Sequence, residues 1–446
     1  MDKDKVCVHP WSHIAINPNG DVWPCCHQRW PHTYTLGNMH EKTIEQIFND
    51  KPLRKLRKRM LAGELPNDVC NKCVEYEKLN VSSPRQIANK ENYAEDVFKL
   101  MEKTKSNGSI ENYNIKYWDL RWSNKCNMAC IMCDPNWSSL WTQQIRTQLK
   151  DIDPFIIGKH TFLNDLDRQA KQAETKVMSV PNNGWIDKHI SEVEFIYFAG
   201  GEPLIMDEHW YILDKLHKLG RHNVKLKYNT NMSKLEHLGK NAIDYWQYWD
   251  RQKLSVEGSI DETGTRAEYI RYGTVWDIVE KNIKMVADAN IKTQPNTSIG
   301  CYNIMRLPEL LEELWELYQQ PKQINLNPVF NVWCRINTLP DDWKQEVKTK
   351  LEKIRDRGTI KITRLEKIID ELDRPHNPEQ VRFLFKRLSF LDMNKKITVL
   401  EAIPEISQLN DRYGGMYEKF RDEWIEKSTN PRFDSAYTYI PSSVHN

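Results

Sequence analysis

The chain has 446 residues, of which 39% are hydrophobic and 28% charged, and its formal net charge is +2. This composition is typical of a globular protein of two or three units, and the balanced charge excludes a general attraction to nucleic acid or membrane surfaces. Because the sequence has no transmembrane-length apolar run, and because residues 1–5 lack the apolar segment of a signal peptide, we expect a cytoplasmic protein. Ten cysteines in a reducing compartment favour metal binding over disulfides.

Residues 1–79 form the first predicted domain, which is built around a hairpin. Two short apolar stretches flank a turn of Pro, Asn and Gly that ends near Gly20. A hairpin brings its flanks together, so the cysteines on either side of it can share a metal, and a later C-x2-C pair completes a set of four thiolates. The four are Cys7, Cys25, Cys70 and Cys73. Cys26 is left over, and we expect it to point away from the metal because neighbours on a strand face opposite sides.

Residues 80–112 are polar and weakly periodic, and they predict a linker with one helix near residues 91–102. Residues 116–122 alternate apolar and polar side chains, as in a strand. A loop with three cysteines follows, and residues 135–150 predict a helix. The loop therefore leaves the C-terminal end of a strand, which is where (β/α) barrels build active sites.

The cysteine loop has the spacing C-x3-C-x2-C, formed by Cys126, Cys130 and Cys133. Thiolates are the preferred ligands of iron–sulfur clusters, and three of them leave one iron of a four-iron cluster open for another ligand. A structural zinc site or a set of buried thiols is the alternative that the spacing alone leaves open.

Further strands are predicted at residues 194–198, 224–228, 253–259, 292–299 and 323–329. With the strand at 116–122 they predict an α/β fold with a parallel sheet. The first of these strands ends in Gly200-Gly201-Glu202, and two glycines at a strand end allow a close approach to the backbone. Residues 150–192 predict a helical insertion, and residues 356–446 predict a helical C-terminal extension with an extended tail from Ser428.

These motifs, in this order, resemble the radical S-adenosylmethionine (radical SAM) superfamily, whose signature is the spacing of the cysteine loop. The resemblance implies a partial, TIM-like (β/α)6 barrel over residues 113–355. It also implies a [4Fe–4S] cluster on Cys126, Cys130 and Cys133, with SAM bound at the open iron.

In that superfamily a Gly-Gly-Glu turn meets the amino group of SAM, and by the same resemblance Ser255 and Arg271 hold its carboxylate. A guanidinium fork fits a carboxylate well. Met132 stands where the family often has an aromatic residue, and its polarizable sulfur can pack on adenine. Glu257 replaces the usual Asp and is a candidate catalytic residue. The candidate cofactor-binding residues are Met132, Gly200, Gly201, Glu202, Asn229, Ser255 and Arg271.

The N-terminal domain resembles the SPASM and twitch auxiliary-cluster domains of the same superfamily, whose opening pattern C-x(9–15)-G-x4-C is matched by Cys7, Gly20 and Cys25. It implies one auxiliary [4Fe–4S] cluster, the twitch form, with a zinc ribbon as the alternative. In the family this module usually follows the barrel, whereas here it precedes it. Cys26 stands where sulfatase-maturating relatives have an acidic base, so it is a candidate catalytic residue or a buried filler.

The resemblance implies a radical SAM enzyme, in which reductive cleavage of SAM gives a 5′-deoxyadenosyl radical that abstracts hydrogen from a substrate. Twitch and SPASM relatives act on ribosomally made peptides and on small molecules such as aminoglycosides. We therefore expect a peptide or protein side chain as substrate, with a small-molecule dehydrogenase or epimerase as the second hypothesis. A non-catalytic metal-binding scaffold is the third. The expected partner is a flavodoxin- or ferredoxin-type electron donor, with no nucleic acid and no membrane.

Overall fold

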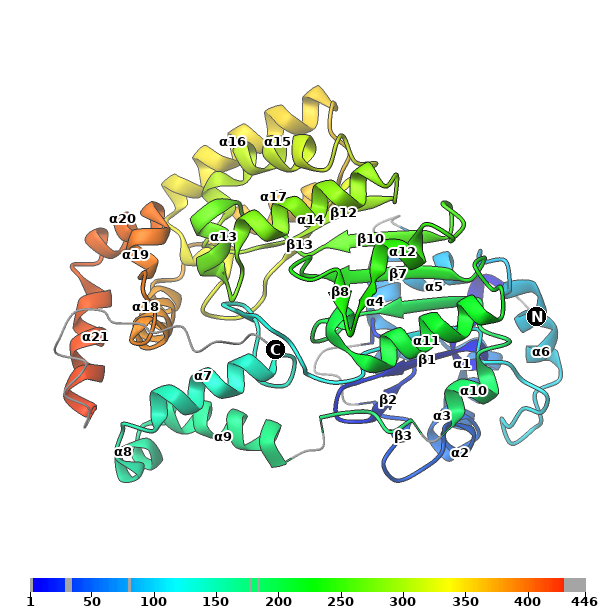
Figure 1. Ribbon diagram of the computed structural model, residues 1–446. Coiled ribbons are helices and arrows are strands. Elements are labelled where there is room, and N and C mark those ends of the chain that lie inside the picture. The colour runs from blue at the N-terminus through cyan, green and yellow to red at the C-terminus, as the bar shows by residue number, and fades with distance from the viewer. Residues whose placement is uncertain (1–2, 29–33, 79–81, 176–177, 183, 429–446) are drawn as a thin grey trace. The chain divides into compact units, whose positions relative to one another are not determined.

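The computed structural model of the protein describes residues 3–28, 34–78, 82–175, 178–182 and 184–428 (Figure 1). The predicted tail beyond Ser428 lies outside these residues. The chain divides into two compact units. The first has the described residues of Met1–Lys125, Lys176–Asn229 and Glu236–Ser255, and the second has those of Cys126–Thr175, Thr230–Leu235 and Val256–Asn446. This division by compactness does not follow the predicted domain boundaries, which stay a prediction.

The first unit contains the strand order β7-β6-β4-β1-β2-β3. The strands are β1 (His13–Ile16), β2 (Asp21–Trp23), β3 (Gly37–Asn38), β4 (Tyr117–Leu120), β6 (Phe195–Phe198) and β7 (Lys225–Thr230). Strands β1, β4, β6 and β7 pair in parallel, whereas β1, β2 and β3 pair antiparallel. Side chains alternate across β4, so Trp118 and Leu120 lie on one face and Tyr117 and Asp119 on the other. A short ribbon of β8 (Glu236–His237) and β9 (Lys240–Asn241) completes the strands described in this unit.

The predicted hairpin is confirmed as β1 and β2, in which Ala15 lies opposite Trp23. The sequence did not predict that β1 also pairs in parallel with β4, placing His13 opposite Tyr117 and Ile16 opposite Leu120. The N-terminal hairpin is therefore an extension of the sheet whose strand β4 leads into the cysteine loop.

Helices surround this sheet along the N-terminal half of the chain (Figure 1). They are α1 (His9–Ser12), α2 (Ile44–Phe48), α3 (Lys51–Leu61), α4 (Asn67–Lys78), α5 (Pro84–Ala88), α6 (Ala94–Glu102), α10 (Trp185–His189), α11 (Asp207–Lys218) and α12 (Ala242–Trp246), with 3-10 turns at Lys3–Lys5 and Pro203–Ile205. The segment predicted as a linker with one helix contains two, α5 and α6. The first begins with a capping box, in which the side chains of Ser83 and Gln86 each accept from the other's backbone N–H.

The second unit contains the strand order β14-β13-β12-β10, in which neighbouring strands pair in parallel and β10 belongs to this unit from Val256 on. These strands are β10 (Leu254–Gly258), β12 (Thr293–Ile299), β13 (Ile324–Pro328) and β14 (Ile362–Thr363), and a separate antiparallel pair is formed by β5 (Ala129–Cys130) and β11 (Arg271–Tyr272). Its helices are α7 (Ser139–Leu149), α8 (Pro154–Lys159), α9 (Thr161–Thr175), α13 (Gly264–Ile270), α14 (Trp276–Asp288), α15 (Leu307–Leu317), α16 (Asp341–Arg357), α17 (Leu365–Leu372), α18 (Pro378–Asp392), α19 (Val399–Ala402), α20 (Pro404–Arg412) and α21 (Met416–Lys427), with 3-10 turns at Ile304–Arg306 and Ile336–Thr338.

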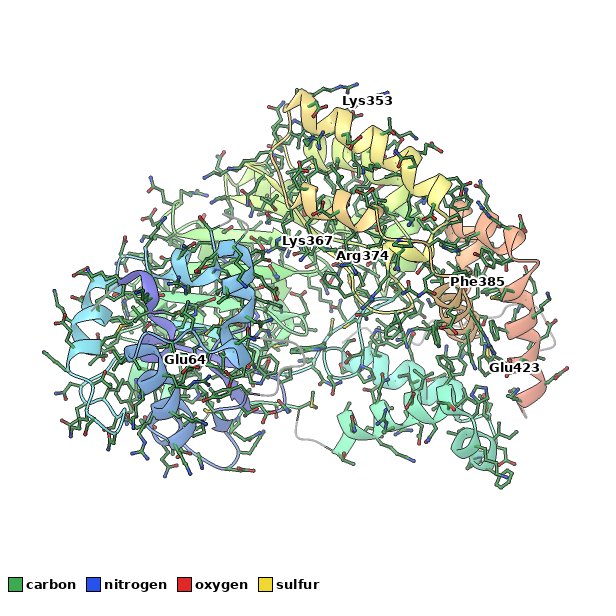
Figure 2. All side chains as sticks on the ribbon, turned by 180° about the vertical axis from the view of Figure 1, so that it is seen from behind. Glu64, Lys353, Lys367, Arg374, Phe385 and Glu423 are labelled. Atoms are coloured by element: carbon green, nitrogen blue, oxygen red, sulfur yellow. The ribbon has the colours of Figure 1, made fainter. Side chains whose placement is uncertain are left out.

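The C-terminal part of the second unit is helical, as predicted. Figure 2 labels Phe385 on α18 and Glu423 on α21, two helices that pack against each other. Trp424 Nε1 donates to Ser389 Oγ at 3.0 Å between these helices, and Gln148 Nε2 on α7 donates to Leu391 O at 2.9 Å. Helix α18 is thereby fixed to the helix that follows the cysteine loop. None of the described helices is both long enough and apolar enough to cross a membrane.

Candidate functional site

The cysteine loop is held on one side by the segment around Arg271. Within the loop, β5 pairs with β11 so that Cys130 lies opposite Arg271, and Ile131 N donates to Ile270 O at 2.9 Å. Gly273 has φ +102°, and a Cβ there would lie 2.4 Å from Asn127 O. A glycine is required at this position because the loop backbone occupies the space of a side chain.

The other side of the loop is held by hydrogen bonds to its carbonyl groups. Trp141 Nε1 on α7 donates to Cys130 O at 2.9 Å. Past the end of β13, Trp333 Nε1 donates to Ile131 O at 3.1 Å and Asn331 Nδ2 donates to Met132 O at 2.8 Å. Three successive carbonyls are thus fixed, and they define the conformation of the loop that carries the thiols.

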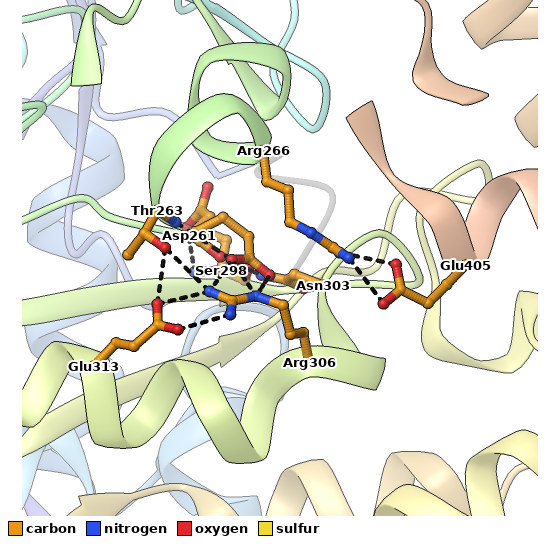
Figure 3. Close-up of polar contacts among 9 residues, drawn as sticks. Asp261, Thr263, Arg266, Ser298, Asn303, Arg306, Glu313 and Glu405 are labelled. Carbon is orange, nitrogen blue, oxygen red and sulfur yellow. Dashed lines mark hydrogen bonds and ion pairs between the residues drawn. The ribbon is translucent and has the colours of Figure 1, made fainter. Parts of the chain in front are cut away.

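Arg271 lies beside the loop as a buried cation. Its Nε is 2.8 Å from Asp261 Oδ2, and its Nη1 donates to Cys130 Sγ at 3.5 Å. Asp261 is itself fixed, because its Oδ1 accepts from Ser298 N at 2.7 Å and its carbonyl accepts from Asn303 Nδ2 at 2.8 Å (Figure 3). Burial opposes the charge on Arg271, yet Asp261 and Cys130 keep the pKa of its guanidinium above the usual value. Burial raises the pKa of the Cys130 thiol, and Arg271 opposes that rise.

The Gly-Gly-Glu turn belongs to the first unit, where it packs on the segment that precedes the cysteine loop. Gly201 has φ +52°, and a Cβ there would lie 2.5 Å from Lys125 O. Glu202 N donates to Lys125 O at 2.9 Å, and the Glu202 carboxylate accepts from Leu204 N at 3.1 Å. The sequence predicted that these glycines admit a ligand. In the structure, the close approach at Gly201 is made by the chain itself.

The remaining predicted residues are divided between the units. In the first unit, Asn229 Nδ2 donates to Tyr197 OH at 2.7 Å, and Ser255 ends the segment assigned to that unit. In the second unit, Glu257 is 5% exposed and accepts from Gln294 Nε2 at 3.0 Å. The structure brings together the three loop cysteines, Met132 and Arg271 in one unit, and Gly200, Gly201, Glu202, Asn229 and Ser255 belong to the other.

The four N-terminal thiols line one cavity. Cys7 precedes α1, Cys25 follows β2, and Cys70 and Cys73 lie on successive turns of α4. Apolar side chains form most of the wall, namely Pro10, Pro24, Leu56, Met60 and Val69, with His9, His27 and Arg85 as its polar members. Cys26 is not part of this lining. Burial raises the pKa of the Cys7 thiol to about 12.

Cys26 belongs to a buried polar group on the face of the sheet that carries Tyr117 and Asp119. Asp119 is fully buried, pairs with Arg121 at 2.9 Å and lies near the Cys26 thiol. The His13 ring stacks on Tyr117 with centroids 4.1 Å apart. Burial holds the pKa of the Asp119 carboxyl well above its usual value, against the opposing charge of Arg121.

Four polar atoms in this group are buried without a hydrogen-bond partner among the described residues. They are His9 Nε2, His13 Nε2, Asp119 Oδ1 and Arg121 Nη1. Asp119 Oδ1 and Arg121 Nη1 face each other as an ion pair, but not in hydrogen-bond geometry. Native proteins leave few buried polar atoms unsatisfied, so such a set is typical of a place where a bound molecule belongs.

Both thiol sets suit iron–sulfur clusters by the chemistry of their donors. Within the described part of the chain, no three His, Cys, Asp or Glu side chains are arranged to hold a single metal ion. A cluster binds each thiolate at a different iron, so its ligands lie further apart than the ligands of one ion. The three thiols beside Arg271 leave an iron open, whereas the four around the cavity make a complete set.

Sequence reasoning did not single out Asp119, Arg121 or Asp261. The first two could have been found, because they sit two positions apart at the end of the strand before the cysteine loop and therefore face the same side. Asp261 offered no such signal, since it follows a strand in an ordinary polar turn.

Comparison with protein families finds two matches. The Iron-sulfur cluster-binding domain (SPASM) matches residues 7–74, and the Radical SAM superfamily matches residues 120–320. A search among curated proteins finds no match.

Several solved structures are similar at low identity. The structure of anSMEcpe with bound AdoMet and Kp18Cys peptide is 13% identical over 54% of this chain and 61% of that chain, with a TM-score of 0.34. Streptococcus suis SuiB bound to precursor peptide SuiA is 14% identical over 73% of this chain and 66% of that chain, with a TM-score of 0.37. The aligned region spans about three fifths of the length of anSMEcpe.

The two family matches cover the thiol sets that the structure describes, one lining a cavity beside the N-terminal hairpin and one on the loop after β4. The chain belongs to the radical SAM superfamily and has an iron–sulfur cluster-binding SPASM domain on the N-terminal side of its radical SAM domain.

Proposed function

We propose that this radical SAM enzyme abstracts hydrogen from a side chain of a peptide or protein, and that its substrate lies against the buried polar group around Asp119. The observation that carries this proposal is the set of unsatisfied buried atoms on His9, His13, Asp119 and Arg121. A peptide group presents one N–H donor and one carbonyl acceptor, which can supply the hydrogen bonds that the ion pair of Asp119 and Arg121 leaves unmade.

Membership of the superfamily implies a [4Fe–4S] cluster and SAM for the radical SAM domain and auxiliary iron–sulfur clusters for the SPASM domain. When bound, the loop cluster supplies an electron that cleaves SAM and so generates a hydrogen-abstracting radical. Cys126, Cys130 and Cys133 would hold this cluster, and Arg271 is the cation placed to receive the SAM carboxylate. Cys7, Cys25, Cys70 and Cys73 would hold an auxiliary cluster.

The residues around Asp119 would then act on the substrate. Arg121 and Asp119 orient the peptide group, and the aromatic face of Tyr117 excludes water beside it. Cys26 lies near Asp119 and outside the lining of the thiol cavity, so it is the candidate thiol for exchanging a proton with a substrate. Glu257, which accepts a hydrogen bond from Gln294, remains the second candidate catalytic residue.

The proposal also retains the finer expectations from the sequence. These are a partial (β/α)6 barrel over residues 113–355, a flavodoxin- or ferredoxin-type electron donor and a reducing, cytoplasmic setting. The peptides in the anSMEcpe and SuiB structures are ligands of those proteins. Peptides are the first substrates to test here, and small molecules are the second.

The experiment follows hydrogen transfer. The anaerobically reconstituted enzyme would be reduced and given SAM together with deuterated peptides encoded beside its gene, and the 5′-deoxyadenosine formed would be analysed by mass spectrometry. Deuterium in 5′-deoxyadenosine and a matching mass change in the peptide are expected. If only a low-molecular-weight metabolite fraction supports turnover, the substrate is a small molecule and not a peptide. The control is the variant that lacks the three loop cysteines.

A further inference from the structure

A buried guanidinium without a hydrogen-bond partner lies beside the cysteine loop. Arg387 on α18 is 3% exposed, and its Nε and Nη2 atoms find no hydrogen-bond partner among the described residues. The ion pairs within the described part of the chain do not include it. Arg271 differs, because its charge is matched by Asp261.

Two tryptophans hold Arg387 in place. Its guanidinium carbon lies 4.1 Å from the ring centroid of Trp333 and 5.0 Å from that of Trp141. These are the same two indoles that donate to the carbonyls of Cys130 and Ile131 in the cysteine loop. The loop and the cation are therefore fixed by one pair of side chains.

Cation–π contacts alone do not account for this burial. They attract the cation only moderately, whereas removing a charge from water is costly unless an anion compensates it. The acidic groups whose charges act on Arg387 are Cys334, Asp134 and Cys133, and Lys395 is a like charge nearby. Asp134 is already engaged, since its Oδ1 accepts from Asn136 N at 2.8 Å and from Asn136 Nδ2 at 3.0 Å. Burial lowers the pKa of Arg387 to about 10, so the side chain stays cationic at neutral pH.

We propose that Arg387 is a positioning residue for the iron–sulfur cluster on the cysteine loop, and that its charge stabilises the cluster's negative charge at the Cys133 side. Three thiolates make the loaded loop anionic, and each electron that enters adds negative charge. A nearby buried cation therefore favours both loading and reduction. The C-terminal helical extension, to which no motif gave a role, would then act on the cluster through α18. This inference depends on the cluster of the superfamily and not on the identity of the substrate.

The test is Arg387→Met, which replaces the cation by an apolar side chain that packs well between aromatic rings. Two effects of opposite sign are expected. The cluster-free protein should melt at a higher temperature than wild type, because a buried unpaired charge is gone. In the reconstituted protein the midpoint potential of the loop cluster should move to a more negative value, because its reduced form loses a nearby cation. That cluster is identified in redox titrations by the electron paramagnetic resonance signal that changes when SAM is added.

Two further variants separate charge from structure. Arg387→Lys keeps the charge, so its midpoint potential should fall between those of wild type and Arg387→Met. Arg266→Gln breaks the 2.8 Å ion pair between Arg266 and Glu405 of α20, which disturbs a contact of the C-terminal helices but leaves Arg387 in place, and its potential should equal that of wild type (Figure 3). An unchanged potential in Arg387→Met would overturn the proposal. A cluster-free Arg387→Met protein that melts below wild type, or that does not fold, would also overturn it, because the cation would then serve the fold itself.

Discussion

The two thiol sets of this protein differ in the charged side chains that lie around them. Around the N-terminal cavity, the one arginine in the lining is already engaged, since Arg85 Nη2 lies 2.6 Å from Glu77 Oε2 and its Nη1 donates to Val6 O at 3.0 Å. Around the cysteine loop, Arg271 donates to a thiol and Arg387 is buried without a carboxylate partner. The difference teaches that mainly apolar side chains line the cavity of the four N-terminal thiols, whereas two guanidinium groups lie beside the three thiols of the loop. Cations at the open set suit a centre that accepts electrons and binds an anionic ligand group.

The largest expected effect separates the two sets by function. Replacing Cys126, Cys130 and Cys133 together by Ala should abolish SAM cleavage, because the open iron site is lost. Roughly four irons per chain should remain, as expected for one four-iron cluster on the other four cysteines. Iron analysis and chromatography of 5′-deoxyadenosine measure both quantities. Continued production of 5′-deoxyadenosine by the triple variant would show that the loop cysteines do not hold the cluster that cleaves SAM.

The second prediction concerns which of two adjacent thiols belongs to the complete set. Cys25 lines the cavity and Cys26 does not. Cys25→Ser should therefore remove the auxiliary iron, while Cys26→Ser should leave the iron content unchanged. The opposite result would mean that the ligand is the next residue along. If Cys26→Ser keeps its iron but loses turnover on an identified substrate, Cys26 takes part in the chemistry and is not a filler.

The third prediction concerns the cation at the open set. Arg271→Lys keeps the charge but loses the planar fork, so SAM affinity should fall by about tenfold, which corresponds to about 1.4 kcal/mol. Equilibrium titration of the reconstituted protein with SAM measures this change. The matched control is Arg306→Lys, at a guanidinium that pairs with Glu262 and Glu313 (Figure 3) and should leave SAM affinity unchanged. Unaltered SAM affinity in Arg271→Lys would show that Arg271 serves only its ion pair with Asp261.

The smallest expected effect concerns how the stability of the protein depends on pH. The second unit buries a guanidinium, whereas the first unit buries imidazoles. Burial lowers the pKa of His9 to about 4 and that of His209 to about 3, so both rings are neutral at neutral pH. The unfolded chain takes up a proton near pH 6.5 that folded His209 does not, so stability falls as the pH drops from 6.5 toward 3. His209→Gln can still hydrogen-bond Tyr228, and between pH 6.5 and 5 it should lose about 1.5 kcal/mol less stability than wild type. Urea unfolding at the two pH values measures this difference, and parallel curves for the two proteins would contradict it.

The sequence predicted correctly those elements whose structure is determined by a short stretch of neighbouring residues. The alternation in β4, the spacing of the cysteine loop and the turn at Gly20 each indicate their structure within a dozen residues, and the structure has the corresponding strand, loop and hairpin. The Gly-Gly turn was predicted for its backbone freedom, and Lys125 O occupies the space that a side chain at Gly201 would need.

Other features depend on contacts that no short window of sequence contains. Arg382, Lys386 and Arg387 form an ordinary basic stretch of a helix, and only the packing of α18 on two distant tryptophans buries Arg387 while Arg382 stays exposed. The pairing of β1 with β4 likewise depends on a register between strands 104 positions apart, which neither strand encodes by itself.

That pairing has a consequence for how the protein is made. On the ribosome, β1 emerges about one hundred residues before the β4 strand that it must lie beside, so its edge stays unpaired while the next several helices are synthesised. Unpaired strand edges are sites where chains aggregate. Strand β1, which lies between Cys7 and Cys25 in the chain, lacks its parallel neighbour until the first strand of the radical SAM domain has been translated. Insertion of iron and sulfide into the N-terminal set is therefore expected to follow synthesis of β4, and a fragment ending after α4 should not fold as a transplantable cluster module.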